Sequence, residues 1–323
     1  MPSPLSFGLI GAGWIGSFHA ETLASRLPNT RLVAVADPVP AAAERFPAQR
    51  VYTDPLDLIA DPNVEAVAIC SPATSHADLV VAAAQTGRHV FCEKPMALTL
   101  ADADRAIDAA RTAGVALQVG FNRRFADGFA AMRAGIDAGA VGTPQLLRSL
   151  TRDPGISADL AARVKPWTIF NETLIHDFDT LCWLNPGARV TEVYAQADAL
   201  VHPQFAEQGF LDTSVVQLRF DNGAFATAEA SFQAVYGYDI RGEVFGSGGV
   251  LQAGLAPEQA GRVNTELFAD AYTEQFAHFA ESVLAGTEPS VTGVDARVAL
   301  EIALAARESI ETKAPVVLSG VPA

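Results

Sequence analysis

A glycine-rich turn near the start of the chain constrains the fold more than any other feature. Residues 6–23, S-F-G-L-I-G-A-G-W-I-G-S-F-H-A-E-T-L, join a short apolar run to an amphipathic segment. Gly11, Gly13 and Gly16 form a G-x-G-x-x-G pattern between them. The first glycine permits a tight turn, the second lets the backbone approach a pyrophosphate, and the third lets helix and strand pack closely. The pattern predicts a dinucleotide-binding βαβ unit.

Two further features define the expected cofactor site. The first turn of the helix would present free backbone N–H groups to an anion, and Trp14 and Ile15 are expected to offer two of them. Asp37 ends the next apolar run, 21 residues beyond Gly16, where an acid can hydrogen-bond both ribose hydroxyls. Its charge would repel a 2′-phosphate, so we expect NAD, with NADP less favoured. A turn aspartate in an ordinary βαβ unit and a phosphate-binding Arg45 remain alternatives.

Strand-like and helix-like segments then alternate as far as residue 121. The expected strands are residues 6–10, 31–37, 64–70, 89–93 and 115–121, and the expected helices include residues 76–86 and 100–113. Such alternation predicts a parallel sheet covered on both faces, with the ligand beyond the carboxyl ends of the strands. Residues 71–76 and 93–95 occupy those ends. Candidate cofactor contacts there are Ser71, Thr74, His76, Glu93 and Lys94.

The second part of the chain has a different pattern of predicted elements. Short strand-like runs follow one another with glycine turns between them, at residues 190–200, 214–220, 224–232, 238–246 and 248–253. Consecutive strands of this kind predict antiparallel hairpins. Helical patterns follow at residues 271–286 and 295–310. We therefore expect an α/β Rossmann domain over residues 1–120 and an α+β domain with a large, mostly antiparallel open sheet over residues 121–323.

Residues 172–184 predict one amphipathic helix between Asn171 as N-cap and the Asn-Pro pair that follows. Its apolar stripe is Leu174, Ile175, Phe178, Leu181 and Cys182. Glu172, His176 and Asp179 recur at i, i+4 and i+7, which places them on the opposite face. On the pattern alone this face is either a solvated surface or a catalytic base with carboxylates beside it.

Bulk properties exclude several function classes. The net charge is −15 and no basic run stands out, so nucleic acid and anionic membranes are poor partners. No apolar stretch reaches the roughly 20 residues of a membrane span, and the first residues lack a signal-peptide pattern. The three cysteines have neither disulfide nor metal-ligand spacing. We expect a cytoplasmic protein without a metal.

The motifs together resemble a known family. G-A-G-W-I-G, A-V-A-D-P, S-P-A-T-S-H, H-V-F-C-E-K-P-M-A-L and V-G-F-N-R-R-F, in this order, are similar to motifs of the Gfo/Idh/MocA oxidoreductases, and the resemblance continues to A-P-V-V-L near the end of the chain. It implies a dinucleotide-binding domain followed by an α+β domain. One face of the second sheet would bind substrate, and the other would make homodimer or homotetramer contacts.

The resemblance also implies roles for individual residues. The lysine of the E-K-P motif, here Lys94, is a catalytic-site residue. Inositol dehydrogenases of the family carry D-x-x-x-H-D-x-D, which this chain matches at His176 and departs from at Glu172. We expect His176 to act as the base, Glu172 to orient it and Lys94 to stabilise alkoxide charge while a secondary hydroxyl of a cyclic polyol or sugar is oxidised. Candidate substrate contacts are Arg124, Thr173, Asp179 and Tyr236.

Other functions within the family remain open from the sequence. A sugar or keto-sugar reductase would use the same site, and an NAD-dependent glycosidase would oxidise its substrate only transiently. A non-catalytic NAD-binding regulator should lack the lysine and histidine pair, yet Lys94 and His176 are both present. The histidines with no partner pattern, for which we expect structural roles, are His19, His89, His202 and His278.

Overall fold

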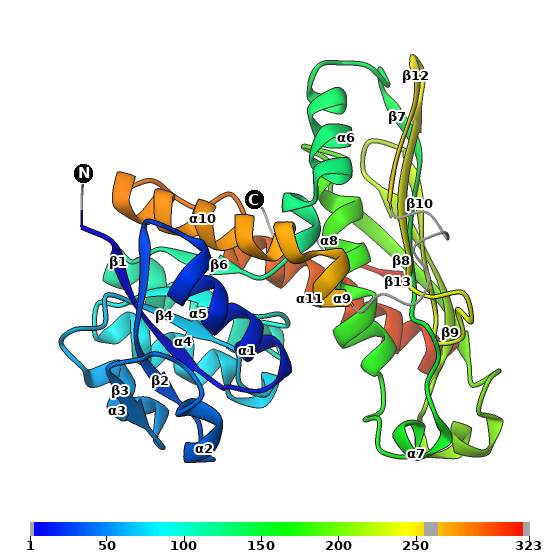
Figure 1. Ribbon diagram of the computed structural model, residues 1–323. Helices are drawn as coiled ribbons and strands as arrows, with labels where there is room; N and C mark the ends of the chain where they lie inside the picture. The colour runs from blue at the N-terminus through cyan, green and yellow to red at the C-terminus, as the bar shows by residue number, and fades with distance from the viewer. Residues whose placement is uncertain (1–2, 255–263, 319–323) are drawn as a thin grey trace. The chain divides into compact units, whose positions relative to one another are not determined.

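The computed structural model describes residues 3–254 and 264–318, which form two units (Figure 1). The first unit comprises Met1–Phe125 and Phe268–Arg297, and the second comprises Ala126–Leu267 and Val298–Ala323. None of the helices in the described parts of the chain is long and apolar enough to cross a bilayer.

The first unit contains a six-stranded sheet in the order β3-β2-β1-β4-β5-β6. The strands are β1 (Leu5–Ile10), β2 (Thr30–Ala36), β3 (Arg50–Tyr52), β4 (Ala66–Ile69), β5 (His89–Cys92) and β6 (Leu117–Val119). All neighbours pair in parallel, which confirms the predicted Rossmann sheet. The strand order reverses at β1, and the ligand crevice of such sheets lies at this switch point.

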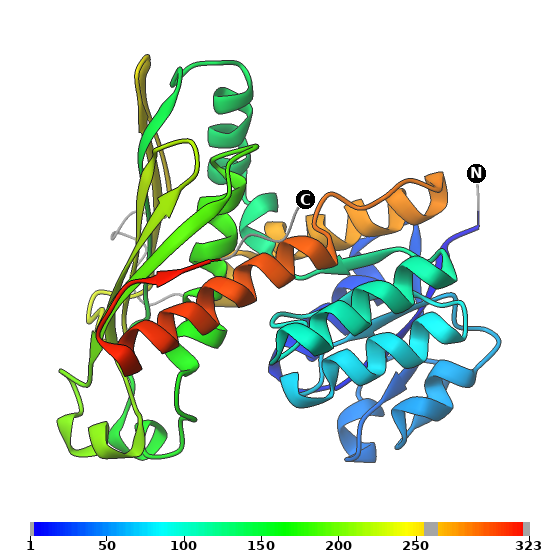
Figure 2. The ribbon, with the colours of Figure 1, turned by 180° about the vertical axis from the view of Figure 1, so that it is seen from behind.

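Helices cover both faces of this sheet. They are α1 (Trp14–Glu21), which continues as a π-helical turn (Thr22–Arg26), α2 (Pro40–Ala43), α3 (Pro55–Ala60), α4 (His76–Gln85), α5 (Leu100–Ala113) and α10 (Ala269–Ala285). Figure 2 shows α4 and α5 side by side over one face. Helix α5 begins at Thr99, whose hydroxyl accepts from the backbone N–H of Asp102, and it ends at Gly114 with φ +68°. Thr99 is thus the N-cap of α5, and Gly114 is its left-handed C-cap.

Helix α10 belongs to the first unit, although the predicted division at residue 120 assigned it to the second. The reason is aromatic packing. The ring of Phe276 lies 4.0 Å from that of Phe91 and 6.1 Å from that of Phe7, measured between centroids. Phe276 and Phe279 are fully buried in the same core as the first strand. The chain therefore returns to complete the dinucleotide-binding unit.

The second unit contains a seven-stranded sheet in the order β12-β11-β7-β10-β9-β8-β13. The strands are β7 (Pro144–Arg152), β8 (Val190–Asp198), β9 (Thr213–Phe220), β10 (Phe225–Ser231), β11 (Asp239–Gly246), β12 (Gly249–Gly254) and β13 (Val316–Val317). Strands β7 and β10 pair in parallel, and the other neighbours in the described sheet are antiparallel, as predicted. Burial alternates along β9, so one face is covered and one is exposed.

Helices α6 (Asp127–Asp137) and α8 (Ile175–Trp183) pack on the covered face, and the later part of α11 (Gly293–Thr312) contacts it at β8. Neither α6 nor the inner strand β7 was predicted. Strand β7 carries Arg148 and Arg152 toward one face, while Ser149 and Thr151 are buried on the other. Polar residues on both faces give no hydrophobic alternation, which explains why the pattern missed this strand.

Candidate active site

The glycine turn has the geometry of a dinucleotide cradle. Gly11 has φ +91°, and a Cβ there would lie 2.7 Å from the carbonyl oxygen of Cys70. A Cβ on Gly16 would lie 1.8 Å from the carbonyl oxygen of Gly11. A Cβ on Gly13 would meet no protein atom within 4 Å. The first and third glycines are thus required by the protein itself, whereas the second keeps open the space that a pyrophosphate would occupy.

A carboxylate and a guanidinium lie beside this turn. Asp37 accepts from the backbone N–H of Ala12 and of Val39, each at 2.8 Å. Arg45 donates from Nη2 to the carbonyl oxygen of Ala12 at 2.9 Å and to Oγ of Ser17 at 3.1 Å. The acid therefore lies where a ribose-binding residue is expected. Arg45, the base kept as an alternative, lies at the same loop.

The turn after β4 holds its candidate residues in different environments. Oγ of Ser71 lies 2.7 Å from Oγ of Ser75, and Thr74 is exposed. His76 is buried, with Nδ1 2.8 Å from the carbonyl oxygen of Pro95 and Nε2 2.7 Å from that of Ser71. Both ring nitrogens of His76 thus contact backbone. Trp14 at the glycine turn is 61% exposed.

Glu93 and Lys94 follow β5 at the same edge of the sheet. Lys94 is half-buried, and its backbone N–H donates to Oε2 of Glu93 at 3.2 Å. Oε1 of Glu93 lies 2.7 Å from Nε2 of His19, and both side chains are buried. Burial raises the pKa of Glu93, but the hydrogen bond with His19 and the attraction of His19 and Lys94 lower it below its ordinary value overall. The Glu93 carboxylate is therefore engaged inside the protein.

The helix with the histidine motif is built differently from the prediction. A π-helical turn spans Ile169–Thr173, and α8 begins only at Ile175. Asn171 is not an N-cap, because the backbone runs through it in the π turn, where the N–H of Leu174 donates to Ile169 at 2.8 Å. The predicted end of the helix before Asn185 is correct. Glu172 thus lies in the π-helical turn, whereas His176 lies in the first turn of α8.

Burial along this segment excludes a simple solvated face. Asp177 is fully buried and Asp179 is 2% exposed, whereas Glu172 is exposed and His176 and Thr173 are half-buried. Asp179 is therefore not part of a solvated surface with Glu172. The sheet covers one side of helix α8, and most of the helix is buried. Its two buried carboxylates therefore need partners.

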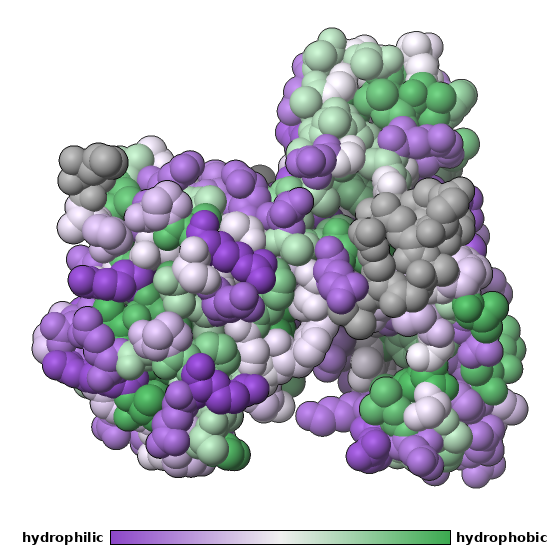
Figure 3. Space-filling view, viewed as in Figure 1, coloured by the Kyte–Doolittle hydropathy of each residue, from purple (hydrophilic) through white to green (hydrophobic). Residues whose placement is uncertain are grey.

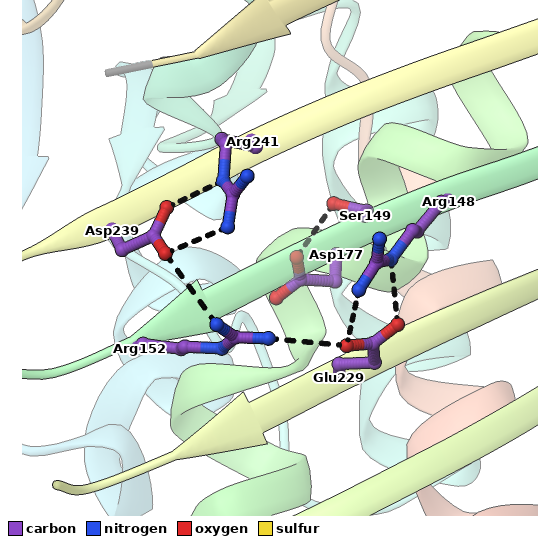
Figure 4. Close-up of polar contacts among 7 residues, drawn as sticks. All are labelled: Arg148, Ser149, Arg152, Asp177, Glu229, Asp239 and Arg241. Carbon is purple, nitrogen blue, oxygen red and sulfur yellow. Dashed lines mark hydrogen bonds and ion pairs between the residues drawn. The ribbon is translucent and has the colours of Figure 1, made fainter. Parts of the chain in front are cut away.

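Asp177 finds such partners on β7. Oγ of Ser149 donates to one carboxylate oxygen at 2.6 Å, and Oγ1 of Thr151 donates to the other at 2.7 Å. Figure 4 shows Asp177 reaching from α8 toward β7, behind the arginines of the exposed face. This link fixes the helix directly beside His176. This contact could not be predicted from local patterns, because both hydroxyls lie on the strand that the hydrophobic pattern missed.

Tyr236 and Arg124 each make polar contacts within their own units. The hydroxyl of Tyr236 donates to Asp239 at 2.9 Å, and Asp239 belongs to the ion network of the exposed sheet face (Figure 4). The Tyr236 hydroxyl is therefore engaged within this network. Arg124 forms an ion pair with Asp295 at 3.0 Å and donates to the carbonyl oxygen of Ser290 at 3.3 Å.

A cavity of about 450 Å³ in the first unit lies away from these residues. Its lining includes His89 and Leu117, at the amino ends of β5 and β6. Ligands of parallel α/β sheets bind at the carboxyl ends, where the glycine turn and Lys94 lie. This cavity is therefore not the expected cofactor site.

Comparisons with known proteins agree with these features. A family model described as "Oxidoreductase family, NAD-binding Rossmann fold" matches residues 5–121, and one described as "GFO/IDH/MocA C-terminal domain" matches residues 129–252. The chain is 39% identical to the myo-inositol 2-dehydrogenase of Thermotoga maritima, over 98% of this chain and 99% of that protein. It is 34% identical to the scyllo-inositol 2-dehydrogenase (NAD(+)) of Bacillus subtilis, over 96% and 95% of the two chains.

A solved structure shows the same fold. The crystal structure of myo-inositol dehydrogenase from Lactobacillus casei in complex with NAD(H) and myo-inositol has a TM-score of 0.87 and 28% sequence identity to this chain. The comparison covers 99% of this chain and 98% of that one. The first unit is thus an NAD-binding Rossmann domain, and the second has the sheet-rich architecture of these dehydrogenases.

Proposed function

Because the chain belongs to the Gfo/Idh/MocA family of oxidoreductases, we propose that it is an NAD-dependent dehydrogenase that oxidises a secondary hydroxyl of an inositol. One observation carries the choice of substrate. The chain matches enzymes named for inositol oxidation over nearly the whole length of both proteins. A closely related cyclic polyol or sugar would present the same secondary hydroxyl to the same residues.

His176 takes the hydroxyl proton in this proposal. An imidazole can accept a proton near neutral pH, which suits a general base in alcohol oxidation. Glu172 orients the ring and favours the imidazolium that forms. Lys94 stabilises the negative charge that develops on the substrate oxygen. Bound NAD supplies the hydride acceptor.

The cofactor contacts follow from the geometry of the first unit. Gly13 leaves room for the pyrophosphate, and the backbone amides of Trp14 and Ile15 begin the helix that faces it. Asp37 binds the adenosine ribose and disfavours a 2′-phosphate. Ser71 and Thr74 contact the cofactor from the neighbouring turn. Glu93 and His76 support that edge from inside the protein, because both are buried.

The substrate contacts are the least constrained part of the proposal. Thr173 and Asp179 each lie three residues from His176 in the sequence, and Asp179 is buried on the same helix. Arg124 retains its place among the candidates on the family resemblance alone. The hydroxyl of Tyr236 is bound to Asp239, so we leave it out of the site.

A substrate screen tests the function. The purified protein is incubated with inositols, aldoses and sugar acids, each with NAD and with NADP, and nicotinamide absorbance is followed. We expect reduction of NAD by at least one inositol, and no reduction by the Lys94→Met variant. Release of sugar from a glycoside without net reduction of NAD would identify a glycosidase instead. Binding of NAD without any turnover would favour a regulator.

We also place the enzyme in the cytoplasm. Cys70, Cys92 and Cys182 form no disulfide bond, and burial raises the pKa of the first two thiols well above the ordinary value. Buried, protonated thiols are typical of proteins in reducing compartments. The substrate is therefore a small polyol that is available inside the cell.

The exposed face of the second sheet is the proposed contact between copies of the chain. In the strand register, Phe225 pairs with Leu146, Leu146 with Phe245, and Phe245 with Val250. All four side chains are between 45% and 55% exposed, so they form one apolar row across four adjacent strands. Figure 3 shows apolar side chains near the end of this unit where Figure 1 labels β12. Exposed rows of this kind mark interaction sites.

An ion network lies beside the apolar row. Arg148 contacts Glu229 at 2.7 Å, Arg152 lies 3.5 Å from the same carboxylate, and Arg241 contacts Asp239 at 2.7 Å (Figure 4). Charges of both signs in one patch can face the same patch of a symmetry-related copy. The proposed assembly is therefore a homodimer, or a homotetramer made from such dimers.

A further inference from the structure

Two buried histidines meet the Glu93–Lys94–Pro95 turn from different elements. His19 lies on α1, and His76 begins α4. His19 is 0% exposed and His76 is 1% exposed. Neither ring therefore faces the solvent-accessible side of the cofactor edge. The sequence predicted a structural role for His19 and a cofactor contact for His76, and their contacts now give each of them a specific role.

His19 holds the residue before Lys94. Its Nε2 lies 2.7 Å from Oε1 of Glu93, while Oε2 of the same carboxylate accepts the backbone N–H of Lys94 at 3.2 Å. The carboxylate thus bridges α1 and the backbone of the lysine. A Cβ on Gly120 would lie 3.0 Å from Oε1, so the neighbouring strand leaves little room for Glu93 to move.

The surroundings of His19 strengthen this bond. Its ring centroid lies 4.8 Å from that of Phe276, 5.6 Å from that of Tyr272 and 6.0 Å from that of Phe91. Aromatic walls exclude water, and a hydrogen bond to a carboxylate is stronger in such a medium than in solvent. The bond that the ring makes to Glu93 is therefore costly to break.

His76 holds the residue after Lys94. Its Nδ1 lies 2.8 Å from the carbonyl oxygen of Pro95, and its Nε2 lies 2.7 Å from that of Ser71. Carbonyl oxygens only accept, so either neutral tautomer makes one of these bonds and the doubly protonated ring makes both. The ring connects the turn after β5 with the turn after β4, which also belongs to the cofactor edge.

We propose that His19 and His76 are positioning residues that hold the Glu93–Lys94–Pro95 turn from both sides and thereby fix the direction of the Lys94 side chain. The inference rests on the proposed function for the role of Lys94, although the contacts themselves do not depend on it. A lysine that must meet a developing charge loses effect when its backbone can shift, and a displacement of about 1 Å can cost about a hundredfold in rate.

Kinetics of matched variants give the first test. His19→Leu and His76→Leu are expected to lower kcat by tenfold to a hundredfold, about the range of a small misplacement, with a smaller change in the Kd for NAD. His19→Gln keeps an N–H donor near the position of Nε2 and should restore most of kcat. His89→Leu removes an imidazole at the other end of β5, where Nδ1 accepts from Ala116, and should leave kcat unchanged. An unchanged kcat in both leucine variants of the turn would overturn the proposal.

The lysine content of the chain allows a second test that needs no substrate. The chain has three lysines, Lys94, Lys165 and Lys313, and the last two are exposed. With ¹³Cε-labelled lysine, the Lys94 resonance is assigned by its loss in Lys94→Arg. We expect it to stand apart from the two exposed lysines in the wild type, and to move toward them in His19→Leu and His76→Leu but not in His89→Leu.

The two tests separate this inference from the proposed function. A Lys94 resonance that moves as expected in a protein that oxidises no polyol would leave the positioning role intact and remove the proposed reaction. If the protein oxidises an inositol but the Lys94 resonance is identical in all three histidine variants, the proposed reaction stands and the positioning role is removed. His19→Gln again serves as the conservative variant, and its Lys94 resonance should resemble that of the wild type.

Discussion

His176 is the residue to which the proposed reaction assigns the proton. Replacement by alanine removes the base while the helix remains pinned through Asp177. We expect His176→Ala to lower kcat by about a hundredfold to ten-thousandfold, the range of a positioned acid or base. Steady-state oxidation of the best inositol from the screen measures this. His202→Ala, in the same unit, is the control, because His202 contacts the backbone of Ile156. Near-normal turnover of His176→Ala would remove it from the mechanism.

We expect Asp37 and Arg45 together to determine the choice of cofactor. Asp37→Ala removes the partner of the ribose hydroxyls and leaves Arg45 at the glycine turn, so we expect NAD to bind about tenfold to a hundredfold more weakly. Binding of NADP should fall much less, because the lost charge no longer repels the 2′-phosphate. Isothermal titration calorimetry with both dinucleotides measures this. In the double variant that combines Asp37→Ala with Arg45→Ala, the affinity gained for NADP relative to NAD should be lost. Equal losses for both cofactors would place Asp37 away from the ribose.

The residues of the cofactor edge were predictable to different degrees. Gly11, Gly13 and Asp37 follow from local spacing, because a turn and its next strand are close in sequence. The partner of Glu93 is His19, 74 residues earlier in the chain, and no local pattern can show a contact of that separation. A histidine on the inner face of α1 was the only available signal, and a structural role was the reasonable expectation from it.

At the scale of elements, the contact between α8 and β7 supports the proposed base. Asp177 accepts two buried hydroxyl donors, and Asp177→Asn replaces one acceptor oxygen by an amide N–H₂ group. We expect the free energy of unfolding to fall by about 1.5–3 kcal/mol, and kcat to fall with it as His176 loses its fixed position. Urea unfolding and steady-state kinetics measure the two effects. Asp159→Asn, at an exposed position of the same unit, should change stability by less than about 0.5 kcal/mol. An Asp177→Asn protein as stable as this control would show that the link is dispensable.

Asp61 links β3 to the end of α3, and its contacts predict how the stability of the protein depends on pH. Burial raises the pKa of Asp61, but hydrogen bonds from Asn63, Arg50 and Tyr52 lower it overall to about 2. The ionised form is therefore favoured by folding. The resulting stability is fully present above the ordinary pKa of about 3.9 and is lost as pH falls through the folded value.

Asp61→Asn should accordingly be less stable than the wild type at neutral pH. The difference should shrink as the pH falls from 4 to 2, because the wild-type carboxylate then takes up a proton. Thermal unfolding followed by circular dichroism across this range measures it. Asp57→Asn on the exposed side of α3 should give a curve parallel to that of the wild type. A constant gap between Asp61→Asn and the wild type would contradict the assignment.

Element types followed from the sequence where one face of the element is apolar. The strand-like runs at β9 and β10 and the helical patterns at α5 and α10 were sufficient for this. Strand β7 was not predicted, because its exposed side carries arginines and its buried side carries hydroxyls that donate to Asp177. The π turn before α8 was not predicted, because the sequence of residues 169–173 fits an α-helix equally well. A π turn differs from an α-helical turn only in its backbone hydrogen bonds.

At the scale of the whole molecule, the order of segments along the chain did not show how the units are composed. The segment Phe268–Arg297 follows the sheet of the second unit, yet it belongs to the first. Periodicity predicted α10 as a helix but could not say which core its aromatic face would enter. Phe276 settles this by packing on Phe91 and Phe7. Helical periodicity identifies an apolar face, and only tertiary contacts identify its partner.

The apolar row of the second sheet determines the expected oligomeric state. If two copies meet through this face, Leu146 and Phe245 lie near its centre, since they pair with each other and are flanked by Phe225 and Val250. An aspartate there would be desolvated against apolar surface in the assembly but hydrated in the separated subunits. The cost therefore falls on association rather than on folding.

Leu146→Asp combined with Phe245→Asp should weaken association by about a hundredfold or more. Analytical ultracentrifugation should then show the wild type at two or four times the chain mass of 33.9 kDa, and the double variant shifted toward that mass. Leu200→Asp, at a side chain that is 67% exposed outside the row, should sediment like the wild type. Circular dichroism confirms that the double variant is folded. A wild type that sediments as a single chain, or a double variant that keeps the wild-type mass, would place any assembly on another surface.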